Sequence, residues 1–136
     1  MIGRKFLTAG EAIFTASSEK TLSHYTFKVC RPDDFKPESP VWFVSMLTGP
    51  NNTEDYTYLG LLNAQGHVIV TKKSAWQETE QCFKVARWVI RQIWDEKPLP
   101  EGYKVNHMGR CSACGRPLTH PESLKTGLGP ICAGRE

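Results

Sequence analysis

The sequence predicts an α+β protein, in which a small antiparallel β-sheet of four to five strands is covered by one amphipathic helix and followed by a C-terminal zinc finger of the knuckle or treble-clef type. Short β-rich runs separated by turns fill about the first 73 residues, one helical run follows, and the chain ends in a Cys-x-x-Cys-Gly motif with a further cysteine. A chain of 136 residues with 40% hydrophobic residues buries one modest core. We therefore divide it into a sheet-and-helix domain (1–96), a linker (97–104) and a finger (105–136).

The strands are expected where β-branched, aromatic and aliphatic residues cluster between turn-forming residues. These runs are residues 11–16, 25–30, 41–47, 56–62 and 67–71. A polar turn joins the first two runs into a hairpin, and a loop with three prolines precedes the third, which is the most hydrophobic. A tight turn at residues 63–66 joins the last two.

A single amphipathic helix is expected from about residue 75 to residue 95. Ser74 and Gln77 have the spacing of a capping box, in which both side chains satisfy free backbone N–H groups of the first turn. Apolar residues then recur at helical spacing, as one buried face of a helix requires. They are Cys82, Ala86, Val89, Ile90 and Ile93. The proline-rich segment 97–102 ends this helix.

The tail carries the chemistry of a structural zinc site. Cys111 and Cys114 are spaced so that one tight turn directs both sulfurs at the same ion, and Gly115 suits that turn. Cys132 offers a third thiolate across a 17-residue loop. A redox pair would open a long helix, which Gly115 and the prolines at 117 and 121 disfavour.

The fourth ligand of the expected single Zn²⁺ is one of two histidines. We favour His107, which leads directly into the turn, over His120, whose backbone is restricted by the following Pro121. His120 remains the substitute, and Cys30 and Cys82 are weaker alternatives. Because Cys82 lies in the apolar stripe of the helix, we interpret it as a buried, inert thiol.

Charge gives only a weak indication of a nucleic-acid partner. The chain carries a formal charge of +3, and Arg110 and Arg116 flank the cysteine pair. Two interpretations of these arginines are equally favoured. They contact phosphates, or they neutralise the negative charge of a zinc site with three thiolates. On the helix, a row that could bind a phosphate backbone and stack a base consists of Lys84, Arg87, Trp88 and Arg91. We favour a merely solvated face for this row.

Aromatic residues of the expected strands offer a second candidate surface. Trp42, Phe43, Tyr56 and Tyr58 have the residue type of a platform on which single-stranded bases stack. Alternation places the two tyrosines on one face of their strand, which an ordinary half-buried strand also requires. For these four residues we favour packing in the core.

Several function classes are not supported by the sequence. It has no recognisable nucleophile–base pair, P-loop or dinucleotide fingerprint, and a zinc ion with four protein ligands has no open position for water. We therefore expect no enzymatic activity. No apolar run has the 18 or more residues that a membrane span needs, and the odd count of five cysteines without a secretory leader indicates a reducing cytoplasm.

The chain resembles an uncharacterised family of small tailed-bacteriophage proteins. The resemblance rests on His107-x-Gly-Arg-Cys-x-x-Cys-Gly-Arg-x-Leu-Thr, on Pro121-Glu-Ser, on Gly127-x-Gly-Pro-x-Cys132, and on stretches of the sheet region such as residues 42–52. It implies a phage protein in the host cytoplasm, with a histidine ligand at position 107. We expect an accessory protein that binds nucleic acid or a nucleoprotein complex. The alternative is a protein-interaction module that inhibits a host defence or replication enzyme.

Overall fold

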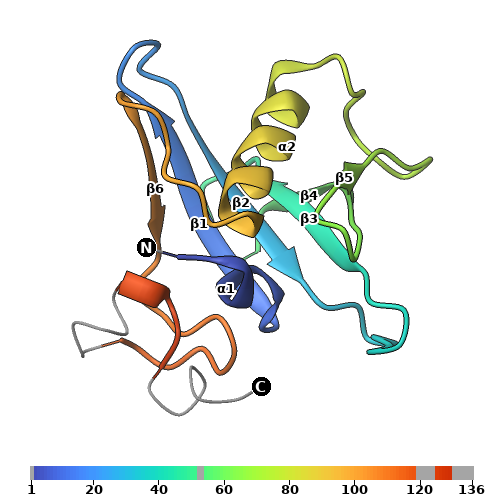
Figure 1. Cartoon of the computed structure of the whole chain (residues 1–136). Coiled ribbons are helices and arrows are strands. Elements are labelled where there is room, and N and C mark those ends of the chain that lie inside the picture. The colour runs from blue at the N-terminus through green and yellow to red at the C-terminus, as the bar shows by residue number, and fades with distance from the viewer. Residues whose placement is uncertain (1, 52–53, 119–124, 130–136) are drawn as a thin grey trace.

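A six-stranded, curled antiparallel sheet forms the body of the protein, with the strand order β5-β4-β3-β2-β1-β6 (Figure 1). The computed structural model describes residues 2–51, 54–118 and 125–129. The strands are β1 (Glu11–Ser18), β2 (His24–Cys30), β3 (Trp42–Leu47), β4 (Tyr56–Leu62), β5 (Val68–Ile69) and β6 (Tyr103–His107). Helices α1 (Arg4–Thr8) and α2 (Gln81–Trp94) both lie on the same side of the sheet (Figure 1).

Alternation of apolar and polar residues explains why one face of the sheet is buried. Along β1, Ala12 and Phe14 are fully buried while Ile13 between them is partly exposed. Phe14 pairs with Phe27 of β2, whose neighbour Val29 pairs with Val44 of β3. Cross-strand partners share a face, so these residues form one apolar layer on the side of the helices.

Helix α2 contributes the other half of the core. Its buried residues recur every three or four positions, which gives one continuous apolar face. They are Cys82, Phe83, Ala86, Val89, Ile90, Ile93 and Trp94. The short helix α1 adds Phe6 and Leu7, which are 1% and 0% exposed. Within the described residues, neither helix combines the length and the apolar character needed to cross a bilayer.

The predicted fold class, a sheet of four to five strands covered by one helix, is wrong. Five strands lie where alternation predicted them, but the sheet has a sixth strand and a second helix. Strand β6 pairs with β1 along five residues, from Phe14↔His107 to Ser18↔Tyr103. It therefore spans the boundary that we drew between linker and finger. Helix α1 has five residues and no side-chain cap, so tertiary burial of Phe6 and Leu7 supports it.

The start of the long helix also differs from the prediction. Ser74 does not cap a helix, because its Oγ accepts the amide of Thr71 at 2.9 Å. The helix begins at Gln81, after Glu80 accepts the amide of Gln77 at 2.7 Å. A serine hydroxyl can accept a hydrogen bond from a backbone N–H of a turn as well as from one of a helix start, and here it bonds the turn.

Candidate nucleic-acid interface and cysteine turn

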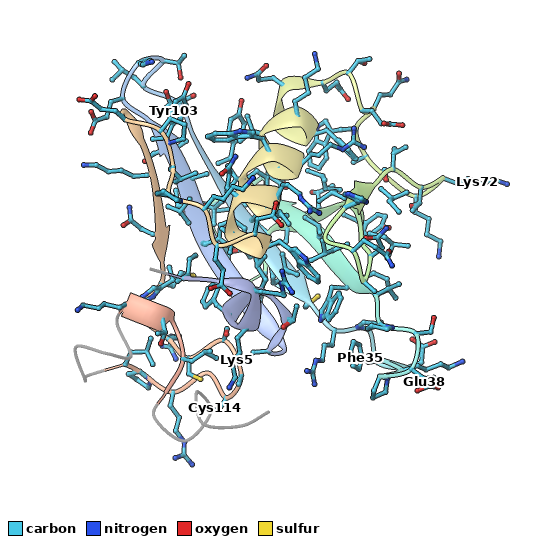
Figure 2. The ribbon with its side chains drawn as sticks, in the orientation of Figure 1. Lys5, Phe35, Glu38, Lys72, Tyr103 and Cys114 are labelled. Atoms are coloured by element: carbon cyan, nitrogen blue, oxygen red, sulfur yellow. The ribbon has the colours of Figure 1, made fainter. Side chains whose placement is uncertain are left out.

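The segment around the cysteine pair folds as the tight turn that the spacing predicts. Arg110 and Pro117 pair as an antiparallel bridge, and the Cys111 amide donates to the Arg116 carbonyl at 2.9 Å. The Gly115 amide donates to the Cys111 carbonyl at 2.8 Å, and Gly115 has a φ of +76°, which favours glycine. Figure 2 labels Cys114, which is exposed, in this segment.

The environment of Cys111 suits a thiolate. Burial alone raises the pKa of this thiol, but hydrogen bonds from the backbone N–H groups of Gly129, Cys114 and Ala113 and from the Cys114 thiol lower the pKa from 9.0 to about 7. In contrast, burial raises the pKa of the Cys30 and Cys82 thiols. The thiolate is the form that binds a metal, so Cys111 is the best prepared for it among the cysteines that the structure describes.

The end of the described chain returns to this turn. Ser112 donates its amide to the Gly127 carbonyl at 3.0 Å, and Leu128 packs with Cys111 in a small apolar cluster. Gly129, three residues before Cys132 in the sequence, lies next to the Cys111 sulfur. Cys132 itself lies outside the described residues, as does His120. The position of Gly129 fits a ligand set that combines the cysteine pair with the chain end.

The structure does not bring His107 together with the cysteine pair. Its partner across β1 is the buried Phe14, so His107 faces the helix side of the sheet, where its ring lies 6.1 Å from that of Phe6. Its Nδ1 accepts the Gly109 amide at 2.8 Å. A ring that accepts at Nδ1 carries its proton at Nε2 and has no lone pair left for a metal. Among the described residues, no three His, Cys, Asp or Glu side chains group closely enough to hold an ion.

The cysteine turn is anchored to the first residue of β1, and the end of the described chain lies against α1. The Glu11 amide donates to the Ser112 carbonyl at 2.8 Å. Gly127 has a φ of +73°, and a Cβ there would overlap the ring carbons of Phe6. The end of the described chain and α1 therefore meet at a contact that accepts no side chain at position 127.

We expect Gly127→Ala to destabilise the protein by roughly 1–3 kcal/mol, because the new methyl group meets both the left-handed backbone and the Phe6 ring. Gly115→Ala is the matched control, since Gly115 has a similar φ of +76° but nothing within 4 Å of the added carbon. Urea unfolding of both variants measures the difference, and hydrogen exchange at the Ser112 amide locates it. Equal losses in the two variants would contradict the Phe6 contact.

The basic row on α2 is engaged within the protein. Arg87 donates to the Val68 carbonyl at 3.0 and 3.2 Å and pairs with Glu78 at 3.0 Å. Arg91 pairs with Asp95 at 2.9 Å and donates to the Gln65 carbonyl at 2.6 Å. The Trp88 ring packs edge-on against Tyr103 with centroids 5.2 Å apart. Lys84 and Arg87 of the predicted row are exposed, but the two guanidinium groups also bind the helix to β5, through Val68, and to the β4–β5 turn, through Gln65.

The face of the sheet opposite the helices carries aromatic and cationic side chains. Cross-strand pairing aligns Lys28 with Ser45 and Ser45 with Tyr58, a row that alternates with the buried residues. The Lys28 Nζ lies 4.5 Å from the centre of the Tyr56 ring. Phe43 is 39% exposed. Its ring centroid lies 5.9 Å from that of Tyr58, and the angle between the two ring planes is 89°. We call this surface, defined by Lys28, Phe43, Tyr56 and Tyr58, the open face.

Packing in the core was therefore the wrong expectation for three of the four aromatic residues. Only Trp42 is buried, at 5% exposure, and its Nε1 donates to the Thr8 carbonyl at 3.3 Å. The sequence did place Tyr56 and Tyr58 on one face of their strand. Lys28 was missed, because its position opposite Ser45 depends on strand register, which a single sequence does not reveal.

The cysteine turn borders the open face. A cavity of about 490 Å³ lies between the outer side of β1 and the turn, and it is lined by Glu11, Ile13, Met108, Arg110 and residues 111–115. Ile13 pairs with Lys28, so this cavity continues the open face toward the turn. Arg110 is exposed there and donates to the Gly115 carbonyl at 3.2 Å, and Arg116 is also exposed. One cationic side chain of the turn, Arg110, thus lines the cavity that extends from the Lys28 side of the open face.

Comparison with known proteins adds one finding. Residues 105–136 are similar to a family described as a family of unknown function, DUF6011. The matched segment includes the last three residues of β6, the cysteine turn and the predicted ligands from His107 to Cys132. No curated protein and no solved structure matches the chain.

Proposed function

We propose that this chain is a phage accessory protein that binds single-stranded nucleic acid, or a nucleoprotein complex containing it, in the cytoplasm of the infected host. The observation that carries the proposal is the open face, where the Lys28 ammonium group lies over the Tyr56 ring and the Phe43 and Tyr58 rings pack against each other, on the side of the sheet opposite α1 and α2. Rings that are exposed, as Phe43 is, or partly exposed, as Tyr56 and Tyr58 are, offer stacking to unpaired bases of any sequence, and the ammonium group offers a phosphate contact.

The arrangement favours single strands over duplexes. In a duplex the base faces are already stacked on each other, so flat rings on a protein surface gain nothing from them. An unpaired strand can instead turn its bases toward the sheet and its phosphates toward Lys28 and Arg110. The helix row is not the main contact, because Arg87 and Arg91 are already engaged within the protein.

We also propose one structural zinc ion at the cysteine turn. Cys111, Cys114 and Cys132 would supply three thiolates, and His107 or His120 the fourth ligand. The low pKa of Cys111 and the position of Gly129 beside its sulfur support the cysteine set. For His107 to serve, its ring would have to leave the Gly109 amide. When bound, zinc would cross-link the turn to the chain end, with no role in catalysis.

The test measures binding of a fluorescent 12-nucleotide oligo(dT) or oligo(rU) by anisotropy across a salt series, with a duplex of the same length as comparison. We expect binding of the single strands to fall with salt, and we expect Lys28→Gln to lower the slope of log Kobs against log salt by about 0.7, the value for one phosphate contact. Lys36→Gln, an exposed lysine in the β2–β3 loop, is the matched control and should leave the slope unchanged. Salt-insensitive binding, or equal affinity for the duplex, would count against the open face.

A protein partner is the second candidate, as for a module that inhibits a host defence or replication enzyme. The observation that favours it is a groove beside the edge strand β6, at a surface separate from the open face.

A further inference from the structure

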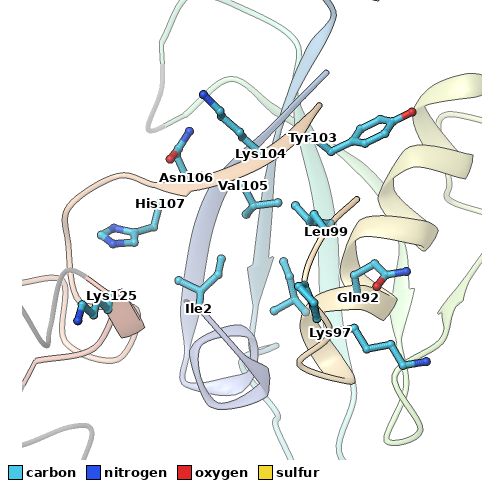
Figure 3. Close-up of a pocket in the computed structure, with 12 residues that line it drawn as sticks. Ile2, Gln92, Lys97, Leu99, Tyr103, Lys104, Val105, Asn106, His107 and Lys125 are labelled. Atoms are coloured by element: carbon cyan, nitrogen blue, oxygen red, sulfur yellow. The ribbon is translucent and has the colours of Figure 1, made fainter. Parts of the chain in front are cut away.

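A groove runs beside strand β6 on the helix side of the sheet (Figure 3). It has a volume of about 490 Å³, and all five residues of β6 line it, from Tyr103 to His107. The opposite wall comes from the end of α2 and the segment that follows it, including Ile93, Lys97 and Leu99. The groove therefore accompanies β6 along its full length.

Among the described strands β6 lies at the edge of the sheet next to β1, and part of its backbone faces away from β1. The Gly102 carbonyl accepts a hydrogen bond from the Glu19 amide on the side of β1. The Tyr103 amide points the other way and donates to the Pro100 carbonyl at 3.2 Å. Backbone direction alternates along a strand, so Val105 has the same outward orientation as Tyr103. Within the part of the chain that the structure describes, the outward N–H and C=O of Val105 make no hydrogen bond.

The side chains beside this edge form an apolar floor. In Figure 3, Val105 extends from β6 toward Leu99 and Ile2. Val105 and Leu99 are partly exposed, so the floor is accessible. An extended segment paired with β6 would direct every second side chain to the helix side of the sheet, where this floor lies.

The charged residues of the groove are all basic. Lys97 and Lys125 are exposed at its two ends, and no Asp or Glu is among the described residues that line it. Lys104 also borders the groove, and it pairs with Glu19 at 3.2 Å. The histidine of the groove, His107, accepts the Gly109 amide. This charge pattern selects an acidic occupant.

We propose that the β6 groove binds an extended, acidic peptide segment of a partner protein, which adds to the sheet as a seventh strand. Backbone hydrogen bonds at Val105 supply the pairing, the floor of Ile2, Leu99 and Val105 takes its apolar side chains, and Lys97 and Lys125 attract its carboxylates. This site is separate from the open face and does not depend on nucleic-acid binding. It gives the protein a second contact surface.

The test uses a synthetic nine-residue peptide in which Asp or Glu alternates with Val or Ile, and a second peptide with Lys at the acidic positions. We expect the acidic peptide alone to bind, and we expect the Val105 amide to gain protection from hydrogen exchange in the complex. Val105→Pro removes the outward N–H but leaves the pairs Thr15↔Asn106 and Ser17↔Lys104 with β1. It should weaken binding about tenfold or more, the ratio that 1.4 kcal/mol represents.

A charge variant covers the case in which Val105→Pro fails to fold. Lys97→Glu with Lys125→Glu should abolish the preference for the acidic peptide, while Lys36→Glu with Lys73→Glu, at exposed lysines elsewhere, should preserve it. Three results would overturn the proposal. They are equal binding of the acidic and basic peptides, an unprotected Val105 amide in the complex, and a dimer in sedimentation that Val105→Pro dissociates, which would assign the edge to a second copy of the chain.

Discussion

Replacing Cys111 by serine is expected to abolish stoichiometric zinc binding and to release the cysteine turn from its ordered state. Cys111 is 2% exposed and receives the backbone hydrogen bonds that favour a thiolate, so no other described thiol can substitute for it. Removing a residue that only hydrogen-bonds to a metal ligand weakens metal binding roughly 10- to 100-fold, so removing the ligand itself should weaken metal binding further. The few apolar residues near the turn, Leu118 and Leu128, cannot replace a metal as the source of folding free energy.

Metal analysis of the purified variant and hydrogen exchange at the Ser112 and Leu118 amides measure this loss. Cys30→Ser is the matched control, because Cys30 is a half-buried thiol on the sheet whose removal should leave one zinc per chain. His107→Ala and His120→Ala then identify the fourth ligand. Full zinc content in Cys111→Ser would remove the site that we propose, and full content in His107→Ala would assign the ligand to another residue.

Much of the sheet could be predicted from residue periodicity. Strands such as β1 and β2 alternate over much of their length between buried and partly exposed residues, and the alternation can be read without a partner. Strand β6 could not be recognised in this way, because its five residues follow two prolines and a glycine and its half-buried side chains include Tyr103 and His107. Its pairing with β1 depends on residues about 90 positions away in the sequence.

The candidate site shows the same division between local and distant information. The Cys-x-x-Cys-Gly spacing predicted the turn correctly, because its hydrogen bonds involve residues within a few positions of each other. The direction of His107 depends instead on its pairing with Phe14, which no local pattern encodes. The surroundings of the basic row also depend on distant residues, because Arg87 and Arg91 reach the carbonyls of Val68 and Gln65, which the fold brings beside the helix.

The combined substitution Phe43→Ala and Tyr58→Ala is expected to weaken binding of a single-stranded oligonucleotide roughly 100-fold. Each stacked base contributes about 1–3 kcal/mol to binding, so the loss of two rings corresponds to a factor of this order. The fold should survive, because both rings lie on the open face and Phe43 is 39% exposed. Anisotropy with labelled oligo(dT) measures the affinity, and urea unfolding measures the stability.

Two control variants distinguish stacking on the open face from binding at the helix row. Tyr58→Phe keeps the ring and removes only the hydroxyl, which bonds Thr71 Oγ1 at 3.1 Å, so it should bind almost as well as the unmodified chain. Lys84→Gln with Trp88→Ala removes two members of the helix row and should also retain binding, because that row lies on the other side of the sheet. If the helix variant lost binding while the Phe43 and Tyr58 variant kept it, the nucleic-acid surface would be the helix row, and the aromatic rings of the open face would need another partner.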